Sequence, residues 1–378
     1  MQKKTRVLVS GFTSNYGGVE SFIYNHYSNM ENDNIQIDIL THTQTPAYKK
    51  EMEDLGGRFF YIPSRNRNPL QYYREAHTFF ETHGKEYDVY WCNKCMLNNI
   101  DFLRYAHQYK IPIRILHSHN SSNMDVGVKG KVMQWMHEFH KTKIGKYATD
   151  YWACSDFAAE WMFSTVLKKG YKYSFIPNSV MAEQFRFNRK VEEEMRQKLG
   201  LSGKFVIGHI GRFNYQKNHA YLLKIFQKVY EKKDNSILVL IGTGELEETI
   251  KAMVKEMNLE DQVLFLGVRH DIPEVIQVFD CFVLPSRFEG LPVVAIEAQA
   301  AGIPCVLSQN GITKQVKIVE KLTFLSLEQG IEEWAEAILD MENHKTDTYE
   351  LIRNQGFDVK EAASRIHDKL LNRLKITM

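Results

Sequence analysis

Long apolar runs and a strong excess of one charge are both missing from this sequence. No apolar segment approaches the ~20 residues that a membrane-spanning helix needs. The apolar stretch within residues 1–11 is too short for the hydrophobic region of a signal peptide. The formal net charge is only +2 in 378 residues, which gives no overall positive field of the kind that marks nucleic-acid binders. These absences predict a cytoplasmic protein that does not bind nucleic acid.

Cysteine is also scarce. An odd number of cysteines spread over strand-like segments is not the pattern of a disulfide framework. Cys92 and Cys95 have the C-x-x-C spacing of a redox site or half of a zinc site, but no second pair completes a set of zinc ligands. We therefore interpret the cysteines as reduced structural thiols. The five are Cys92, Cys95, Cys154, Cys281 and Cys305.

The chain alternates between short aliphatic runs and amphipathic stretches of about 10–18 residues. This alternation predicts an α/β fold, in which parallel strands are joined by crossover helices. The strands predicted in the first half are 6–11, 36–41, 58–62, 87–91, 113–117, 150–153 and 173–177. Those predicted in the second half are 205–210, 236–241, 262–266, 281–284, 304–307 and 323–325.

Two consecutive series of this kind predict two doubly wound domains. A polar, charged segment without a strand pattern, 182–203, separates them. We place the first domain at 1–185 and the second at 186–357, followed by a closing helix within 358–378. Ligands of such open sheets bind outside the carboxyl ends of the strands, so two facing domains would form one cleft.

One predicted strand, 281–284, is followed by a loop and then by a helix that Pro292 begins. The segment from the end of the strand into the helix is Leu284-Pro-Ser-Arg-Phe-Glu-Gly-Leu-Pro-Val-Val-Ala-Ile-Glu297. Glu289 and Glu297 would lie about 12 Å apart along a helix axis, farther than the ~5–9.5 Å between the two carboxyls of a glycoside hydrolase. This spacing favours holding the two ends of an elongated ligand through its hydroxyls. Two such glutamates are more often surface residues, but Glu297 lies in the otherwise apolar helix 291–301.

The segment Gly211-Arg-Phe-Asn-Tyr-Gln-Lys217-Asn218 follows the strand 205–210 and precedes a predicted helix, with Asn218 as its N-cap. Arg212 and Lys217 would therefore lie at a strand end beside a helix N-terminus. Two fixed cations there can bind a diphosphate and stabilise the charge that builds on it as it leaves a sugar. Taken alone, such a pair is more often two solvated loop cations.

Three weaker signals follow other strands. Gly242-Thr-Gly244 resembles the start of a dinucleotide fingerprint, but the third glycine is missing, so we interpret it as a tight strand-to-helix turn. Gly17 and Gly18 open a helix and would let backbone amides approach a phosphate, although an ordinary turn is equally consistent. His119 ends a strand and could stabilise charge on a reacting sugar, although a single histidine is usually structural.

Together these segments resemble the retaining family 4 glycosyltransferases, most of all the bacterial enzymes that build capsular and exopolysaccharide repeat units. The resemblance covers nearly the whole chain in the right order, and the paired glutamates with the arginine and lysine are its most specific part. It implies the GT-B fold, with two Rossmann-like domains facing across a cleft. The segments that carry it are Glu289-Gly-Leu-Pro to Glu297, Gly211-Arg-Phe to Lys217, Gly17-Gly18-Val-Glu20, His119 with its neighbours, and Pro177-Asn178.

The resemblance also implies a role for each residue. Arg212 and Lys217 would bind the donor diphosphate, Glu297 the ribose hydroxyls and Glu289 the transferred sugar. The second domain would hold the donor, the first would hold the acceptor, and the closing helix would pack back on the first. The donor-binding residues implied are Gly17, Gly18, Arg212, Lys217, Gly242, Glu289, Gly290, Leu291 and Glu297. Those implied in catalysis are His119 near the anomeric centre, Glu289, Arg212 and Lys217.

The reaction implied is transfer of a hexose-type sugar, with retention of configuration, from a nucleotide-diphosphate sugar such as a UDP-sugar. The acceptor would be a glycan or a lipid-linked sugar. No Asp-x-Asp, the metal–diphosphate motif of the other large glycosyltransferase fold, occurs in the sequence. We therefore expect neither a metal nor another cofactor. Arg287 and Phe288 are bulkier than their counterparts in many relatives, and Pro177-Asn178-Ser-Val lacks the common Asn-Gly, so the resemblance does not name the donor sugar.

Residues 129–146 are rich in lysine and have Val132, Trp135, Met136 and Phe139 at helical spacing. Such a helix can lie on an anionic membrane surface, here the inner face of the plasma membrane. The alternative is an ordinary helix that packs this apolar stripe on its own sheet.

Three other functions stay open on the sequence alone. A nucleotide-sugar epimerase and a phosphorylase can share the two-domain fold, and a phosphorylase would need a lysine-bound pyridoxal phosphate. The third is a non-catalytic partner of a glycosyltransferase.

Overall fold

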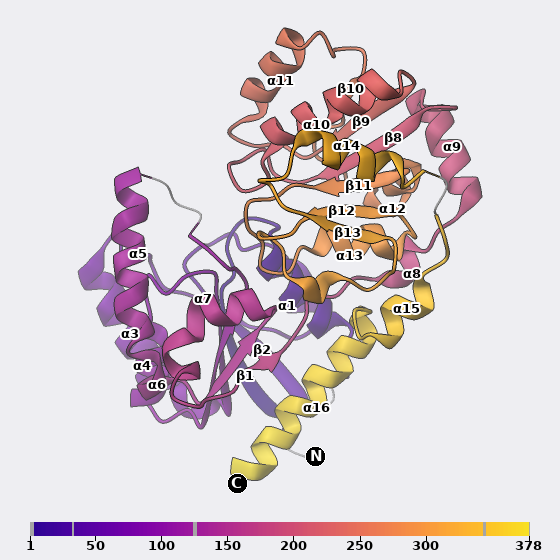
Figure 1. Cartoon of the computed structure of the whole chain (residues 1–378). Helices are drawn as coiled ribbons and strands as arrows, with labels where there is room; N and C mark the ends of the chain where they lie inside the picture. Colours follow the sequence, from indigo (N-terminus) through magenta and orange to yellow (C-terminus); the bar gives the residue numbers. More distant parts are fainter. Residues whose placement is uncertain (1–3, 32–33, 124–126, 343–344, 378) are drawn as a thin grey trace. The chain divides into compact units, whose positions relative to one another are not determined.

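A computed structural model describes residues 4–31, 34–123, 127–342 and 345–377 and divides the chain into two compact units (Figure 1). Unit 1 comprises Met1–Asn178 and Val359–Met378, and unit 2 comprises Ser179–Asp358. The predicted domain limits at residues 1 and 378 lie outside the described residues.

Within its described residues, unit 1 has a seven-stranded, all-parallel sheet in the order β3-β2-β1-β4-β5-β6-β7. Its strands are β1 (Thr5–Ser10), β2 (Ile35–Thr41), β3 (Phe59–Tyr61), β4 (Val89–Lys94), β5 (Ile113–Ser118), β6 (Asp150–Ala153) and β7 (Ser174–Phe175). Its helices are α1 (Gly18–Ser28), α2 (Lys49–Asp54), α3 (Pro69–His83), η1 (Gly84–Glu86), α4 (Asp101–Gln108), α5 (Gly127–Lys141), α6 (Ile144–Tyr147), α7 (Asp156–Leu167) and α16 (Val359–Thr377).

The closing helix α16 packs beside α1 in unit 1 (Figure 1). Ile366, Leu370 and Leu374 recur at helical spacing and join the apolar cluster that contains Ile23 and Tyr27 of α1. The apolar stripe of α16 thus ties the last segment of the chain to the first unit.

Unit 2 has, within its described residues, a six-stranded parallel sheet in the order β10-β9-β8-β11-β12-β13. Its strands are β8 (Phe205–Ile210), β9 (Ser236–Ile241), β10 (Val263–Phe265), β11 (Cys281–Leu284), β12 (Cys305–Ser308) and β13 (Leu322–Leu325). Its helices are α8 (Ala182–Phe185), α9 (Arg189–Leu199), α10 (His219–Lys232), α11 (Glu247–Glu256), α12 (Ile272–Val275), η2 (Ile276–Val278), α13 (Val293–Ala300), η3 (Lys314–Val316), α14 (Ile331–Leu339) and α15 (Tyr349–Asn354).

These sheets confirm the predicted α/β class with two doubly wound, Rossmann-like units. The boundary between them lies before α8, whereas the predicted one lies after it. The reason is that α8 packs against α13 and α15 of unit 2. The charged segment forms α9, whose N-cap Asn188 accepts hydrogen bonds from the amides of Lys190 and Val191.

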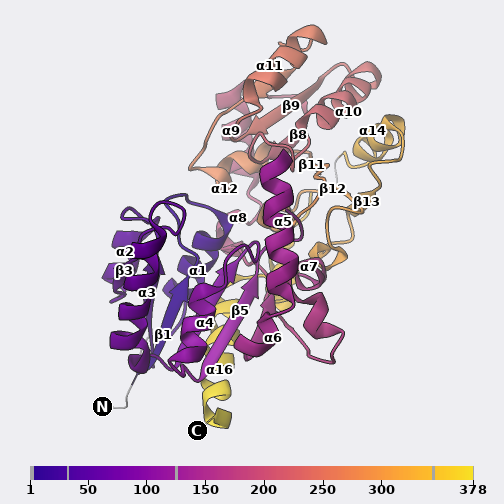
Figure 2. The same ribbon diagram turned by 90° about the vertical axis from the view of Figure 1, so that its left-hand side faces the viewer.

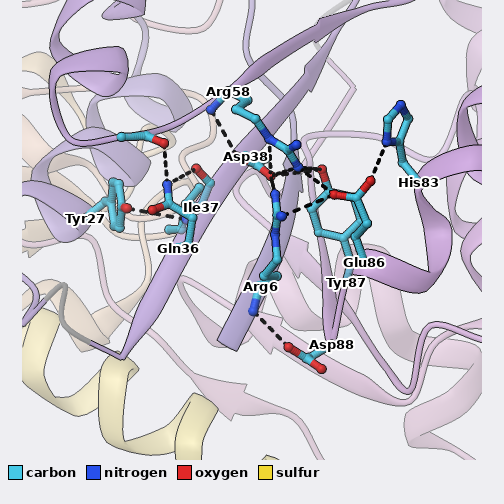
Figure 3. Close-up of polar contacts among 11 residues, drawn as sticks. Arg6, Tyr27, Gln36, Ile37, Asp38, Arg58, His83, Glu86, Tyr87 and Asp88 are labelled. Carbon is cyan, nitrogen blue, oxygen red and sulfur yellow. Dashed lines mark hydrogen bonds and ion pairs between the residues drawn. The ribbon is translucent and has the colours of Figure 1, made fainter. Parts of the chain in front are cut away.

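A buried carboxylate ties together the first three strands of unit 1 (Figure 3). Asp38 of β2 is fully buried and pairs with Arg6 of β1 and with Arg58, which immediately precedes β3. The Arg58 guanidinium lies 2.8 Å from the Asp38 carboxylate, and the Tyr87 hydroxyl donates to it at 3.0 Å. Burial raises the pKa of Asp38, although the Tyr87 hydrogen bond and the charge of Arg6 oppose the rise. These contacts hold the register of the sheet edge β3-β2-β1.

The strand orders also indicate where each unit binds ligands. Each order reverses direction once, between β1 and β4 in unit 1 and between β8 and β11 in unit 2. The loops that leave two such strands diverge to opposite faces of the sheet, which opens a crevice at their carboxyl ends.

Candidate active site

In unit 2, the loops after β8 and β11 bring a lysine and a glutamate together. The Lys217 ammonium lies 2.8 Å from the Glu289 carboxylate, and both side chains are largely buried, with 14% and 9% of their surface exposed. The Gln216 amide donates to the other oxygen of Glu289 at 3.1 Å. The backbone amide of Arg287 donates to the Gln216 carbonyl and fixes the two loops against each other. The carboxylate is therefore held in one orientation by two donors from the facing loop.

Glu297 lies on α13, which begins at Val293 with Pro292 just before its first turn. Burial raises the pKa of Glu297 to about 7, and the positive charge of Lys217 opposes this rise. Within the described residues its carboxylate has no hydrogen-bond or ion-pair partner. A partly buried carboxylate without a partner is unfavourable unless a ligand supplies hydrogen-bond donors.

Arg212 follows the same strand as Lys217 but has a different partner. Its guanidinium pairs with Glu245 of the loop after β9 at 3.2 Å, and 69% of its side chain is exposed. An exposed ion pair of this kind contributes little stability, so the guanidinium can exchange Glu245 for another anion at small cost. Lys217 therefore lies next to Glu289, whereas Arg212, on the same loop, is exposed to solvent.

The predicted turn at Gly242 has a steric reason. A Cβ atom on Gly242 would lie 2.2 Å from the carbonyl oxygen of Gly211, and the Gly242 φ of +132° also disfavours other residues. Phe213 donates its amide to the Thr243 carbonyl at 3.0 Å. Gly242 therefore lets the loops after β8 and β9 pack together. The predicted site residues Gly290 and Leu291 are both buried in the segment between Glu289 and α13.

Asn218 precedes α10 as predicted, but its side chain does not cap the helix. Its backbone is left-handed, with φ 60°, which turns the side chain away from the first helical amides. The side-chain amide instead donates to the Pro285 carbonyl at 3.1 Å and accepts from Arg287 at 2.9 Å. The Arg287 guanidinium also stacks over Tyr215, 4.5 Å from the ring centre. Arg287 thus connects the loop after β11 to the loop after β8.

In unit 1 a cavity of about 490 Å³ opens between the loops that follow β1 and β4. Gly17 and Gly18 at the start of α1 line one side, and Asn93 and Lys94 at the end of β4 line another. Glu20 of α1 accepts a hydrogen bond from the backbone amide of Thr13 at 2.9 Å, which holds the loop after β1 in place. The cavity lies at the carboxyl ends of the two strands where the sheet order reverses.

His119 lies just beyond β5, next to this cavity. Its Nε2 donates to the Asn93 side-chain oxygen at 2.8 Å, and the Asn93 amide group in turn donates to the Ser10 carbonyl. Burial, with a smaller contribution from His26, lowers the pKa of His119 to about 3. The ring is therefore neutral at physiological pH and can act only through hydrogen bonds or polarity.

Sequence reasoning missed several of these residues. The motifs assign no role to Gln216 or Glu20, although both lie in the segments that carry the resemblance. The spacing of Cys92 and Cys95 draws attention to the two thiols and not to Asn93 and Lys94 between them. Asn93 and Lys94 are polar residues that end a buried strand next to the first strand, which is the signal that could have identified them. The cysteines are free, and burial raises the pKa of Cys95 to about 11, so this thiol is neutral.

Val132, Trp135 and Phe139 of the apolar stripe of α5 are exposed, so the alternative that the stripe packs on its own sheet is wrong for these three side chains, whereas Met136 is half-buried. The exposed fractions are 51% for Val132, 69% for Trp135 and 51% for Phe139. The opposite face of α5, which includes His137, is buried and packs toward α7 (Figure 2).

Two features are absent from the part of the chain that the structure describes. No helix in this part is both long enough and apolar enough to span a bilayer. Nor do the residues of this part gather three or more His, Cys, Asp or Glu side chains in a group able to hold a metal ion.

Comparison with known proteins places this chain among sugar-transferring enzymes. The family model described as "Glycosyl transferases group 1" matches residues 191–358. EpsF of Bacillus subtilis, named as a glycosyltransferase, is 35% identical over 341 residues, which cover 89% of this chain and 87% of that protein. An Escherichia coli enzyme named UDP-Gal:alpha-D-GlcNAc-diphosphoundecaprenol alpha-1,3-galactosyltransferase is 38% identical over 151 residues, 39% of each chain.

Solved structures agree on the fold. HepE of Anabaena, crystallised with UDP and glucose, superposes with a TM-score of 0.74 at 18% identity, covering 97% of this chain and 99% of that one. Sucrose-phosphate synthase of Thermosynechococcus elongatus gives a TM-score of 0.76 at 17% identity, covering 99% and 100%. These likenesses confirm the GT-B class for the two Rossmann-like units. Over nearly its whole length, this chain belongs to the group 1 glycosyltransferases, the family 4 type that its motifs resemble.

Proposed function

We propose that this glycosyltransferase moves a hexose-type sugar from a UDP-sugar to a glycan or lipid-linked acceptor in cell-surface polysaccharide synthesis. The transfer retains the anomeric configuration and needs neither a metal nor another cofactor. Unit 2 holds the donor and unit 1 the acceptor. The names of the relatives support this proposal, because they include a UDP-sugar donor and a diphosphoundecaprenol-linked acceptor, and a structural neighbour was crystallised with UDP and glucose.

The observation that carries the proposal is the arrangement of Lys217, Glu289 and Glu297 at the switch point of unit 2, the place between β8 and β11 where the strand order reverses direction. Lys217 is held rigidly by Glu289, where a cation can neutralise a diphosphate. Glu297 has no partner among the described residues, so its carboxylate is available to accept from ribose hydroxyls. Glu289 likewise accepts from hydroxyls of the transferred sugar. This set matches the parts of a nucleotide sugar: sugar, diphosphate and ribose.

The reaction we propose is a front-face substitution at the anomeric carbon. The bond from that carbon to the diphosphate oxygen breaks, and a bond to the acceptor hydroxyl oxygen forms on the same face. The acceptor proton passes to the departing phosphate oxygen, so no protein base is required. Lys217 and Arg212 stabilise the negative charge that builds on the diphosphate, in place of a metal ion. Neutral His119 contributes polarity near the reacting centre.

The test is incubation of the purified protein with a panel of nucleotide sugars, with and without acceptor extracts, analysed by mass spectrometry. We expect slow hydrolysis of one UDP-sugar alone and transfer of its hexose when acceptor is present. Conversion of the free nucleotide sugar into an isomer would instead indicate an epimerase. Complete absence of binding and turnover would indicate a non-catalytic partner.

UDP binding should weaken as the pH falls from 8 to 6. Burial raises the pKa of Glu297 to about 7, and the ionised carboxylate accepts hydrogen bonds from hydroxyls more strongly than the protonated carboxyl does. At one unit below this pKa the group is mostly protonated, so the UDP dissociation constant should rise about tenfold between pH 8 and pH 6. Titration calorimetry across this range measures it.

The Glu297→Gln variant is the matched control, because the phosphates of UDP titrate equally in both proteins. The variant should bind UDP more weakly than the unmodified protein. Its dissociation constant should also change less with pH, because the variant has no carboxyl to titrate at this position. Identical pH profiles for the two proteins would remove Glu297 from the nucleotide site.

We also propose that unit 1 contacts an anionic membrane surface through α5, with the protein otherwise cytoplasmic. Trp135 and Phe139 are exposed and stacked, with ring centres 6.0 Å apart. Lys143 lies over the Phe139 ring at 5.4 Å, and Lys131 is also exposed. Exposed aromatics flanked by lysines suit the interface of an anionic bilayer.

The purified protein should bind phosphatidylserine-containing vesicles at low salt, and the double variant Trp135→Ser/Phe139→Ser should bind at least tenfold more weakly. Vesicle sedimentation at low and high salt measures this, and high salt should release the protein. Leu70→Ser removes an exposed apolar side chain on α3, 87% exposed, and should leave binding unchanged. Failure of the unmodified protein to bind at low salt would end this proposal.

A further inference from the structure

The cavity that opens between the loops after β1 and β4 is lined by a cation that has no ion-pair partner among the residues that the structure describes. Lys94 ends β4 at the switch point and lines the cavity. Its ammonium makes no ion pair or side-chain hydrogen bond with any residue that the structure describes. Most of the half-buried lysines and arginines that the structure describes have a carboxylate partner, as Arg65 has Asp101 and Arg196 has Asp280.

The other titratable groups that line the cavity and that the structure describes form no ion pair with Lys94. Glu20, the carboxylate of the lining, instead accepts from both the backbone amide and the hydroxyl of Thr13. His42 donates its Nδ1 proton to the Ile62 carbonyl at 2.9 Å. Burial lowers the pKa of His42, and the charge of Lys94 lowers it further, so its ring stays neutral.

The rest of the lining suits a hydroxyl-rich ligand. Amide and hydroxyl side chains predominate, and two apolar side chains can cover the face of a sugar ring. The volume of about 490 Å³ lies within the ~300–1,000 Å³ of small-molecule sites. The polar lining includes Thr13, Asn15, Thr41, Asn98 and Ser122, and the apolar lining includes Met96 and Phe102.

We propose that Lys94 recognises an anionic group, a phosphate or a carboxylate, on the saccharide acceptor that binds in unit 1. This inference rests on the proposed function in one respect, that the cavity is the acceptor site. A neutral acceptor would leave the ammonium desolvated without a direct ion-pair partner, whereas an anionic one forms a charge-assisted hydrogen bond with it. Lys94 therefore sets the charge of the acceptor that this enzyme selects.

The experiment measures direct binding of matched saccharides by calorimetry, with UDP at saturation to occupy the donor site. One arm uses methyl glycosiduronic acids, a second uses short-chain alkyl diphosphate-linked monosaccharides, and a third uses the neutral methyl glycosides. We expect at least one anionic arm to bind about 10- to 100-fold more tightly than the neutral arm. The arm that does so identifies the source of the charge.

Substitutions test whether Lys94 causes the preference for anionic saccharides. Lys94→Gln should abolish the difference between the anionic and neutral arms, and Lys94→Arg should keep most of it. Lys85→Gln, on η1, is the matched charge control and should leave the preference intact. Equal binding of all three arms to the unmodified protein, or an unchanged preference in Lys94→Gln, would overturn the proposal. UDP binding is measured separately, so a protein that failed to bind UDP would contradict the proposed function while the charge preference could still be read.

Discussion

Replacing Lys217 by alanine is expected to slow glycosyl transfer about 100- to 1,000-fold. The side chain is largely buried and fixed by Glu289, and its backbone amide is held by Asn214 at 3.1 Å. A cation positioned before the reaction stabilises developing negative charge without a reorganisation cost, and loss of one such donor typically costs about 2.7–4 kcal/mol of transition-state stabilisation. Single-turnover transfer at saturating donor measures the loss.

The control for this variant is Lys228→Ala. Lys228 lies on α10 of the same unit and pairs with Glu231 in a solvent-exposed contact, so its removal should leave the rate unchanged. Thermal unfolding of both variants separates a catalytic loss from misfolding, because Lys217→Ala also leaves Glu289 without its cation. Transfer by a folded Lys217→Ala protein at the unmodified rate would refute the site.

Replacing Asp38 by alanine is expected to lower the free energy of unfolding of unit 1 by about 2–3 kcal/mol, the cost of losing charge-assisted hydrogen bonds to a buried group. Arg6 and Arg58 would lose their shared buried carboxylate and keep Glu86, at 3.2 and 2.9 Å, as their remaining partner (Figure 3). The Tyr87 hydroxyl would lose its carboxylate acceptor. Urea unfolding followed by tryptophan fluorescence measures the change, since Trp91 and Trp152 lie in the core cluster of unit 1.

Glu53→Ala tests whether any carboxylate on this unit would give the same result. Glu53 lies on α2 in an exposed pair with Lys49 at 3.9 Å, and such pairs contribute little. The expected change is too small to measure. An equally small effect for Asp38→Ala would show that the buried cluster does not hold the first three strands together.

Much of the fold could be predicted from the sequence because the signals are local. The predicted strands at 150–153, 205–210, 236–241 and 281–284 coincide with β6, β8, β9 and β11. Each is a short apolar run bounded by polar or turn residues, and a strand buried on both faces of a parallel sheet must have this pattern. The domain boundary was placed less well, because α8 joins unit 2 through packing that its own four residues do not encode.

The candidate site also has features that could be predicted from the sequence and features that could not. Lys217 and Glu289 each follow a strand with apolar periodicity, so the pattern placed both at carboxyl ends, and the strand order then made those ends adjacent. The partner of Arg212 could not be predicted, because Glu245 approaches only when the loops after β8 and β9 pack through Gly242. The outward direction of Trp135 was equally undetermined, since helical periodicity defines a stripe but not what covers it.

The sequence by itself determined the α/β class, the two successive strand series and the loops that carry the charged residues. Those features follow from interactions among neighbours along the chain. Only the tertiary structure decided that Lys217 pairs with Glu289, that Trp135 and Phe139 of α5 face solvent and that Lys94 lines a cavity. The first and the third depend on which distant strands become neighbours where a sheet reverses its order. The second depends on which face of α5 packs toward α7. Packing of the whole unit decides all three.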